Sequence, residues 1–148
     1  EYIRDSEGAG TYRSGMGVRQ DWEVLQDVYL ATHSNRHKKP APGISNGKPG
    51  SLSKLILNYD SDNPVDLPRE TANYPLKKGD VVTVLAGGGG GYGEPLKRNP
   101  LSVLEDVRNE KISVGRAADI YGVVIDTKNW TVKNSETAEM RAKGIAGG

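Results

Sequence analysis

The chain has 148 residues, the length of one domain. Its 20 Lys and Arg against 19 Asp and Glu leave a net charge of +1, which argues against nucleic-acid binding through a large positive field. The lack of Cys excludes a disulfide scaffold and thiolate metal sites within the chain, and no apolar stretch approaches the roughly 20 residues that span a bilayer. Because no signal-peptide pattern opens the chain, we expect a cytoplasmic protein with no membrane partner. The balanced charge leads us to expect no nucleic-acid partner.

The N-terminal part combines glycine-rich loops with strand patterns. Residues 5–17 are expected to form a loop, because four irregularly spaced glycines allow turns. Apolar residues then fall at even positions (Val18, Trp22, Val24), and the alternation resumes in 28–32. This period of two predicts a pair of strands with one buried and one wet face.

The middle of the chain is irregular before it returns to strands. Residues 33–51 are polar and contain three prolines, so this long stretch is expected to be functional or to pack against a partner. Strands are predicted at 55–57 and at 81–86, where β-branched residues form a continuous run. Turns are predicted at 60–64 and at 75–80.

The spacing of apolar residues becomes helical after the last glycine run. Asn99 can cap a helix that starts at Pro100, with Leu101, Leu104 and Val107 on its inward face.

Two shorter helices are expected beyond it. Ser113 is expected to cap the first, with Ala117 and Tyr121 inward and Gly122 as its end, and the second is predicted at 135–143.

These elements predict an α+β fold, with an antiparallel β-rich N-terminal two-thirds followed by short C-terminal helices. We expect one domain over residues 1–148, β-rich at 5–93 and helical at 99–143.

The most conspicuous motif is the run Gly87–Gly93, in which only Tyr92 is not glycine, directly after the 81–86 strand. The N–H groups of such a loop can cradle a phosphate, and Gly88, Gly90 and Gly93 match the dinucleotide spacing. No helix N-terminus follows, however, and no Lys-Ser or Lys-Thr pair supplies a P-loop. The other interpretation is that glycines let the backbone pack closely against another element, with Tyr92 as an anchor.

His33 and His37 are four residues apart and could hold a metal if they lay on a helix. The segment leaves a predicted strand, however, runs into Pro40 and contains no carboxylate. Arg36 and the neighbouring lysines could instead receive an anion or an acidic partner surface, or form a solvated loop. We therefore predict no metal site in this chain.

No catalytic residues are predicted, because the carboxylates are scattered, there is no Cys nucleophile and no G-x-S-x-G elbow. Residues that contact a substrate or a partner are expected first in the glycine run and next in the irregular stretch. The candidates are Gly88, Gly90, Tyr92, Gly93, Arg36 and His37.

Four blocks, in this order along the chain, together resemble the C-terminal end of the hydantoinase B/oxoprolinase family. They are residues 5–18, 47–50, 78–96 and 99–124. That family includes subunits of N-methylhydantoinase and of acetone and acetophenone carboxylases. The chain departs from the usual family pattern at Glu94, Lys97, Asn99 and Val114-Gly115, and its 39–43 loop lacks the usual aromatic residues.

The resemblance implies a small accessory subunit of an ATP-dependent carboxylase or hydantoinase complex, without a catalytic centre of its own. Members of the family are several times longer, so we expect a fragment or a split subunit, similar to the small subunit of acetophenone carboxylase. The implied partners are a large hydantoinase B-like subunit and a hydantoinase A-like subunit, in a hetero-oligomer.

The same resemblance implies the chemistry of the whole complex. It would use ATP with Mg²⁺ and bicarbonate to carboxylate a ketone such as acetophenone, with an additional metal in partner subunits and no cofactor in this chain. Two hypotheses from the residues remain beside it, a nucleotide-binding module that uses Gly87–Gly93 and a scaffold or nucleic-acid-binding piece.

Overall fold

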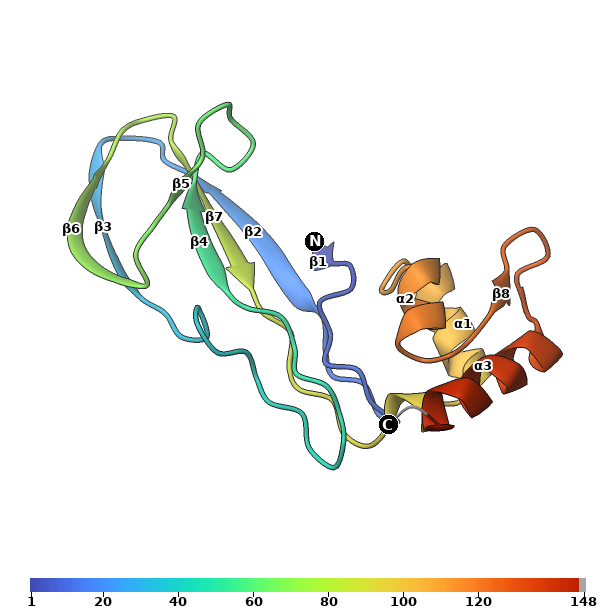
Figure 1. Ribbon diagram of the computed structural model, residues 1–148. Helices are drawn as coiled ribbons and strands as arrows, with labels where there is room; N and C mark the ends of the chain where they lie inside the picture. Colours follow the sequence, from blue (N-terminus) through green and yellow to red (C-terminus); the bar gives the residue numbers. More distant parts are fainter. Residues whose placement is uncertain (147–148) are drawn as a thin grey trace.

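The computed structural model of the chain describes residues 1–146 and has the predicted α+β architecture (Figure 1). The strands are β1 (Tyr2–Ile3), β2 (Gly17–Glu23), β3 (Val28–His33), β4 (Lys54–Leu57), β5 (Val65–Asp66), β6 (Glu70–Leu76), β7 (Val81–Ala86), β8 (Ile125–Asp126) and β9 (Thr131–Val132). The helices are the 3₁₀ turn η1 (Pro95–Lys97), α1 (Pro100–Arg108), α2 (Val114–Asp119) and α3 (Asn134–Ala146). Within residues 1–146, no helix is long and apolar enough to cross a bilayer.

A five-stranded antiparallel sheet, in the order β1-β2-β7-β4-β5, forms the centre of the β-rich part. In its register Trp22 of β2 pairs with Val82 of β7, which pairs with Leu57 of β4. Directly paired residues point to the same side of a sheet, so these side chains share one apolar face. The alternation in β2 therefore identifies the apolar face, but residues 20–23 are exposed on both faces, so the predicted buried face is not observed along this part of the strand.

A two-stranded ribbon of β3 and β6 folds back over this apolar face. β2 continues into β3 and β6 continues into β7, and the N–H of Val24 donates to the carbonyl of Asp80 at the bend (2.8 Å). Leu76 of the ribbon and Val82 of the sheet belong to one buried cluster between the layers. The ribbon covers the face only in part. Trp22 therefore remains 62% exposed, whereas the sequence predicted a buried position.

β6 is the longest of the strands that the sequence analysis does not predict. β6 extends to Leu76, whereas a turn is predicted from residue 75. β6 pairs with β3 alone, and a proline such as Pro75 is tolerated in an edge strand when its nitrogen faces away from the partner. The turn itself follows at 77–80.

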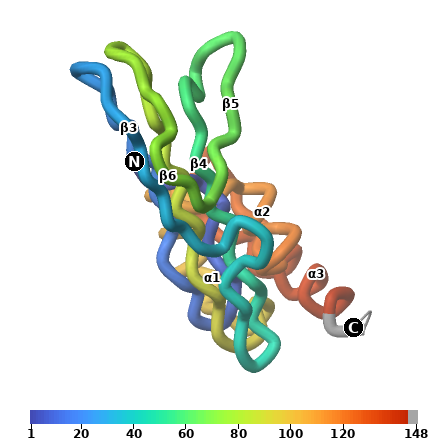
Figure 2. Tube along the Cα trace, turned by 90° about the vertical axis from the view of Figure 1, so that its left-hand side faces the viewer, coloured from blue at the N-terminus to red at the C-terminus, as the bar shows by residue number. Residues whose placement is uncertain are grey.

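The C-terminal helices pack around a second buried cluster at the other end of the molecule from the ribbon (Figures 1 and 2). Both predicted caps are present, because the Asn99 side chain accepts from the N–H of Leu101 and the Ser113 hydroxyl accepts from the N–H of Arg116. The cluster consists of Ala9, Val103, Leu104, Val107, Ile112, Ala117, Tyr121, Val123 and Ile125.

The inward face of α1 differs from the predicted one. Leu101 is 66% exposed, whereas Val103, Leu104 and Val107 are buried. A helix turns by about 100° per residue, so a stripe centred on Val103 and Val107 leaves Leu101 well to one side.

Candidate functional site

Three glycine-rich segments lie side by side beyond the ends of β2, β4 and β7 (Figure 1). We term them the glycine layer; its first segment is 6–15, its second is 41–51 and its third is the run Gly87–Gly93. The N–H of Gly8 donates to the carbonyl of Gly89 (2.9 Å), and the N–H of Gly91 donates to the carbonyl of Lys48 (3.0 Å). The run is thus hydrogen-bonded to both of the other segments.

The glycines of the run face their neighbours with a period of three. A Cβ on Gly88 or on Gly91 would collide with carbonyl oxygens of the first segment. A Cβ on Gly87 or Gly90 would collide with carbonyl oxygens of the second segment. Three residues per turn is the period of the polyproline II helix, and glycine is required where such chains pack with their backbones in contact.

Most amide groups of the run donate hydrogen bonds inside the layer. The N–H of Gly88 donates to the Ser51 hydroxyl (2.9 Å), and those of Gly91 and Gly93 donate to backbone carbonyls of the second segment (both 3.0 Å). A phosphate-binding loop needs several N–H groups that converge on the anion. This arrangement argues against the nucleotide-binding interpretation and for close backbone packing.

Tyr92 carries the aromatic side chain of the run, and it lies at the surface. Its backbone forms bridges to Tyr12 on one side and to Ile44 on the other. The rings of Tyr92 and Tyr12 have centroids 6.3 Å apart, and the three side chains are 54%, 69% and 63% exposed in the order Tyr92, Tyr12, Ile44. We term these three residues the tyrosine patch. Tyr92 is therefore not an anchor inside this chain but part of an exposed aromatic surface.

Arg36 and His37 lie near the opposite end of the glycine run. The N–H of Ser53 donates to the carbonyl of Arg36 (3.0 Å), while the Ser53 hydroxyl accepts from the N–H of Gly87 (3.1 Å). At about 3.1 Å per residue, five residues of extended chain separate Gly87 from Tyr92 by about 15 Å. The structure therefore does not gather the candidate residues into one site.

The structure places the two histidines in different surroundings. His33 lies in β3 beside Glu70, with 4.0 Å between Nδ1 and Oε1. His37 lies outside the strand, is half-buried and lines a small pocket of 170 Å³ with Leu55 and Leu67. Within residues 1–146, no three His, Cys, Asp or Glu side chains are grouped to hold a metal ion.

A buried carboxylate joins the glycine layer to the helices. Arg13 donates to Asp106 of α1 with both Nε (2.8 Å) and Nη2 (2.7 Å), and Arg98 adds a third hydrogen bond (2.8 Å). Burial by itself would raise the pKa of the Asp106 carboxyl, but the two guanidinium groups outweigh it and hold this pKa below its ordinary value. Asp106 is therefore an ionised structural residue.

A second buried carboxylate lies close to the first. Glu7 of the first segment accepts hydrogen bonds from Arg116 Nε (2.7 Å) and from the Tyr121 hydroxyl (3.0 Å). Burial, followed by the nearby Glu7 charge, raises the pKa of Tyr121 well above its ordinary range. The hydroxyl stays protonated and remains a donor to Glu7.

The sequence analysis did not predict the residues of these two buried ion pairs. Arg13 and Asp106 are 93 positions apart, and Glu7 and Arg116 are 109 positions apart. No local spacing rule connects residues at such separations. A charge placed in a glycine-rich loop, as Glu7 and Arg13 are, was the one available signal.

Comparison with known proteins places the chain in a family. Residues 1–95, more than half of the chain, match the family model of hydantoinase B/oxoprolinase. The chain belongs to the hydantoinase B/oxoprolinase family, as the four sequence blocks indicated.

Three curated relatives are long polypeptides, and the chain spans about a quarter of the length of each. An uncharacterized protein of Methanocaldococcus jannaschii is 37% identical over 139 residues, which are 93% of this chain and 24% of that protein. The caprolactamase subunit beta of Pseudomonas jessenii is 35% identical over 129 residues (84% and 22%). The acetophenone carboxylase delta subunit of Aromatoleum aromaticum is 28% identical over 170 residues (94% and 25%).

Two solved structures share the fold. The ATP-dependent caprolactamase from Pseudomonas jessenii matches 96% of this chain and 25% of its own with a TM-score of 0.76 and 29% identity. A nucleotide-free acetone carboxylase matches 97% of this chain and 24% of its own with a TM-score of 0.63 and 18% identity, which is a likeness of fold. The relatives thus include subunits of ATP-dependent carboxylase and lactamase-type enzymes.

Proposed function

We propose that the chain is a structural unit that completes a hydantoinase B-like subunit of an ATP-dependent carboxylase or hydantoinase-type complex, without a catalytic centre of its own. The observation that carries this proposal is the tyrosine patch, three large apolar side chains exposed together on a layer held by backbone hydrogen bonds between its segments. Protein interfaces are enriched in tyrosine, and an exposed apolar cluster is typical of a contact surface. The relatives support it, because they carry the same unit within a subunit about four times as long.

In this proposal the remaining chemistry belongs to other parts of a cytoplasmic hetero-oligomer. ATP with Mg²⁺ and bicarbonate bind to the hydantoinase A-like and large hydantoinase B-like partners, and a further metal lies in a partner subunit. Similarity to the acetophenone carboxylase delta subunit supports a ketone such as acetophenone as the substrate. The higher identity to caprolactamase subunit beta favours ATP-dependent opening of a cyclic amide as a second candidate reaction. Residues 1–148 act as one domain in either case.

A chimera tests this function. The quarter of caprolactamase subunit beta to which this chain is similar would be replaced by the chain itself, and the product would be expressed with its partner subunit. We expect the complex to assemble and to retain ATP-dependent caprolactamase activity, because this quarter supplies packing and not chemistry. Size-exclusion chromatography and an activity assay measure the two results.

The tyrosine patch is tested in the same chimera. The double substitution Y12S/Y92S is expected to lower the yield of assembled complex several-fold, because it removes two exposed interface rings. Y29S is the matched control, since Tyr29 is 75% exposed on β3 and lies outside the patch. Assembly that is unaffected by Y12S/Y92S, or ATP hydrolysis by the isolated chain, would contradict the proposed function.

A further inference from the structure

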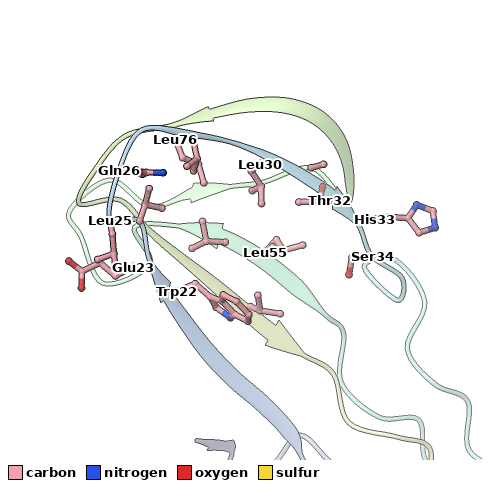
Figure 3. Close-up of a pocket in the computed structure, with 15 residues that line it drawn as sticks. Trp22, Glu23, Leu25, Gln26, Leu30, Thr32, His33, Ser34, Leu55 and Leu76 are labelled. Carbon is pink, nitrogen blue, oxygen red and sulfur yellow. The ribbon is translucent and has the colours of Figure 1, made fainter.

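A groove of 590 Å³ opens between the five-stranded sheet and the β3–β6 ribbon (Figure 3). Trp22 and Leu55 line it from the sheet, Leu30 and Leu76 from the ribbon, and Leu25 from the bend between β2 and β3. Figure 3 shows these five side chains directed toward one space. The groove is therefore the unfilled part of the apolar layer that elsewhere holds the sheet and the ribbon together.

The exposure of its side chains shows how incomplete this layer is. Trp22 is 62% exposed and Leu25 is 74% exposed, although Trp22 lies on the apolar face of the sheet, paired with Val82. Val82 itself is 5% exposed, in the same row of the same face. An exposed tryptophan at a position whose strand neighbour is buried marks a place where apolar surface remains to be covered.

The strands beside the groove also have an unpaired backbone edge. β1 pairs with β2 only at Gly17 and Val18, so within the described residues the outer edge of β2 has no strand partner from Gln20 to Glu23. β3 pairs with β6 alone, which leaves its outer edge unpaired as well. Most residues that line the groove belong to this continuous β2–β3 stretch. The groove therefore opens where a further strand could be added.

We infer that an extended apolar segment from the remainder of the hydantoinase B-like subunit occupies this groove and adds a strand to the β2–β3 edge. Main-chain hydrogen bonds along the edge would orient the segment, and alternate side chains would cover Trp22 and Leu25. This inference rests on the proposed function and names the surface through which the unit is joined to the larger subunit. The ribbon already packs on the sheet through Leu76 and Val82, and a third strand would extend it on its open side.

The relatives identify this occupant in preference to a second copy of the chain. In caprolactamase subunit beta, as in the other relatives, the equivalent unit is part of a polypeptide with about three-quarters of its length outside the match. A segment of that polypeptide would be present beside the groove in every molecule, at a high effective concentration. A second copy would require association between separate molecules.

Cysteine labelling in the caprolactamase chimera tests the inference. The chain has no Cys, so Leu25→Cys in the groove and Asn63→Cys in the exposed β4–β5 turn each add one thiol whose peptide is followed by mass spectrometry. In the isolated chain we expect both thiols to be alkylated at similar rates. In the chimera we expect alkylation at position 25 to slow at least about tenfold relative to position 63, the factor given by about 1.4 kcal/mol of protection.

A second variant keeps the test independent of that thiol. W22S is expected to lower the melting temperature of the chimera more than that of the isolated chain, whereas Y29S on the outer face of β3 changes both equally.

Equal labelling rates in an assembled, active chimera would overturn the inference and leave the proposed function intact. A chimera that does not assemble would overturn both. Dimers of the isolated chain in which position 25 is protected would show that a second copy is the occupant, which also overturns the inference.

Discussion

Asp106 forms one of the two buried ion pairs between the glycine layer and the helices. It is 4% exposed, and its carboxylate accepts three hydrogen bonds, two from Arg13 and one from Arg98. A bidentate guanidinium–carboxylate pair with a further charged donor is among the stronger polar contacts in proteins, and removal of one partner leaves buried charge unbalanced.

Asp106→Asn is therefore expected to lower the free energy of unfolding at pH 7 by about 3 kcal/mol. The folded pKa of Asp106 lies below its unfolded value of about 3.9, so the unfolded chain takes up the proton first as the pH falls. The stabilisation is present above about pH 4 and is lost as the pH falls through the folded pKa. Urea unfolding of both proteins between about pH 7 and pH 2 should show a smaller loss of stability on acidification in the variant.

Asp27→Asn is the matched control for this prediction. Asp27 pairs with Lys77 at 2.8 Å, but both side chains are more than half exposed. An exposed pair contributes about 0–1 kcal/mol, so this variant should remain close to the native stability. Equal losses in the two variants would contradict a special role for Asp106.

Among the elements, the glycine layer has the strictest requirement for its sequence. Gly8 faces the backbone nitrogen of Gly91 and the carbonyl oxygen of Gly89 at distances that leave no room for a Cβ. A Cβ on Gly15, in the same first segment, would have no such neighbour within 4 Å. The requirement for glycine is therefore local to the packed face of the segment.

Gly8→Ala is expected to destabilise the chain by about 3 kcal/mol, because the surrounding backbone atoms cannot give way to the added methyl group. Gly15→Ala should be neutral or stabilising by up to about 1 kcal/mol, because it restricts the unfolded chain without a clash. Thermal and urea unfolding of the two variants measure the difference. A Gly8→Ala protein as stable as Gly15→Ala would show that the segments are not in backbone contact.

At the scale of the whole molecule, the hydrogen bonds of the glycine layer argue against phosphate binding by the run Gly87–Gly93. The N–H groups of Gly88, Gly91 and Gly93 already donate hydrogen bonds to oxygen atoms of the second segment. We therefore expect calorimetry of the isolated chain with ATP-Mg²⁺ or ADP-Mg²⁺ to show no binding tighter than millimolar. Micromolar binding of either nucleotide would contradict this expectation and restore the nucleotide-binding hypothesis for the run.

Strand and helix positions could largely be predicted, because their signals are local. The alternation around Trp22, the β-branched run of β7 and the caps at Asn99 and Ser113 each depend on residues within a few positions. β6 was missed because Pro75 is typical of a turn, and an edge position was needed to tolerate it.

The candidate site was harder to predict, because its parts come together only through long-range contacts. The run Gly87–Gly93 has two interpretations in sequence, phosphate cradle or close packing, and the difference lies in where its N–H groups point. Tyr12 and Ile44 become neighbours of Tyr92 through backbone bridges, although they lie 80 and 48 positions before it in the chain. No spacing rule relates residues so far apart.

By itself the sequence determined the fold class and the order of the main elements, because periodicity, capping residues and turn residues act over short distances. It also indicated the family, through the resemblance of four blocks of residues along the chain. Only the tertiary structure decided that the glycines form a hydrogen-bonded layer and that Trp22 lies in an open groove. It also decided that the carboxylates of Asp106 and Glu7 are buried, each in an ion pair with an arginine. Those properties depend on which distant segments are adjacent and on how much apolar surface their packing leaves uncovered.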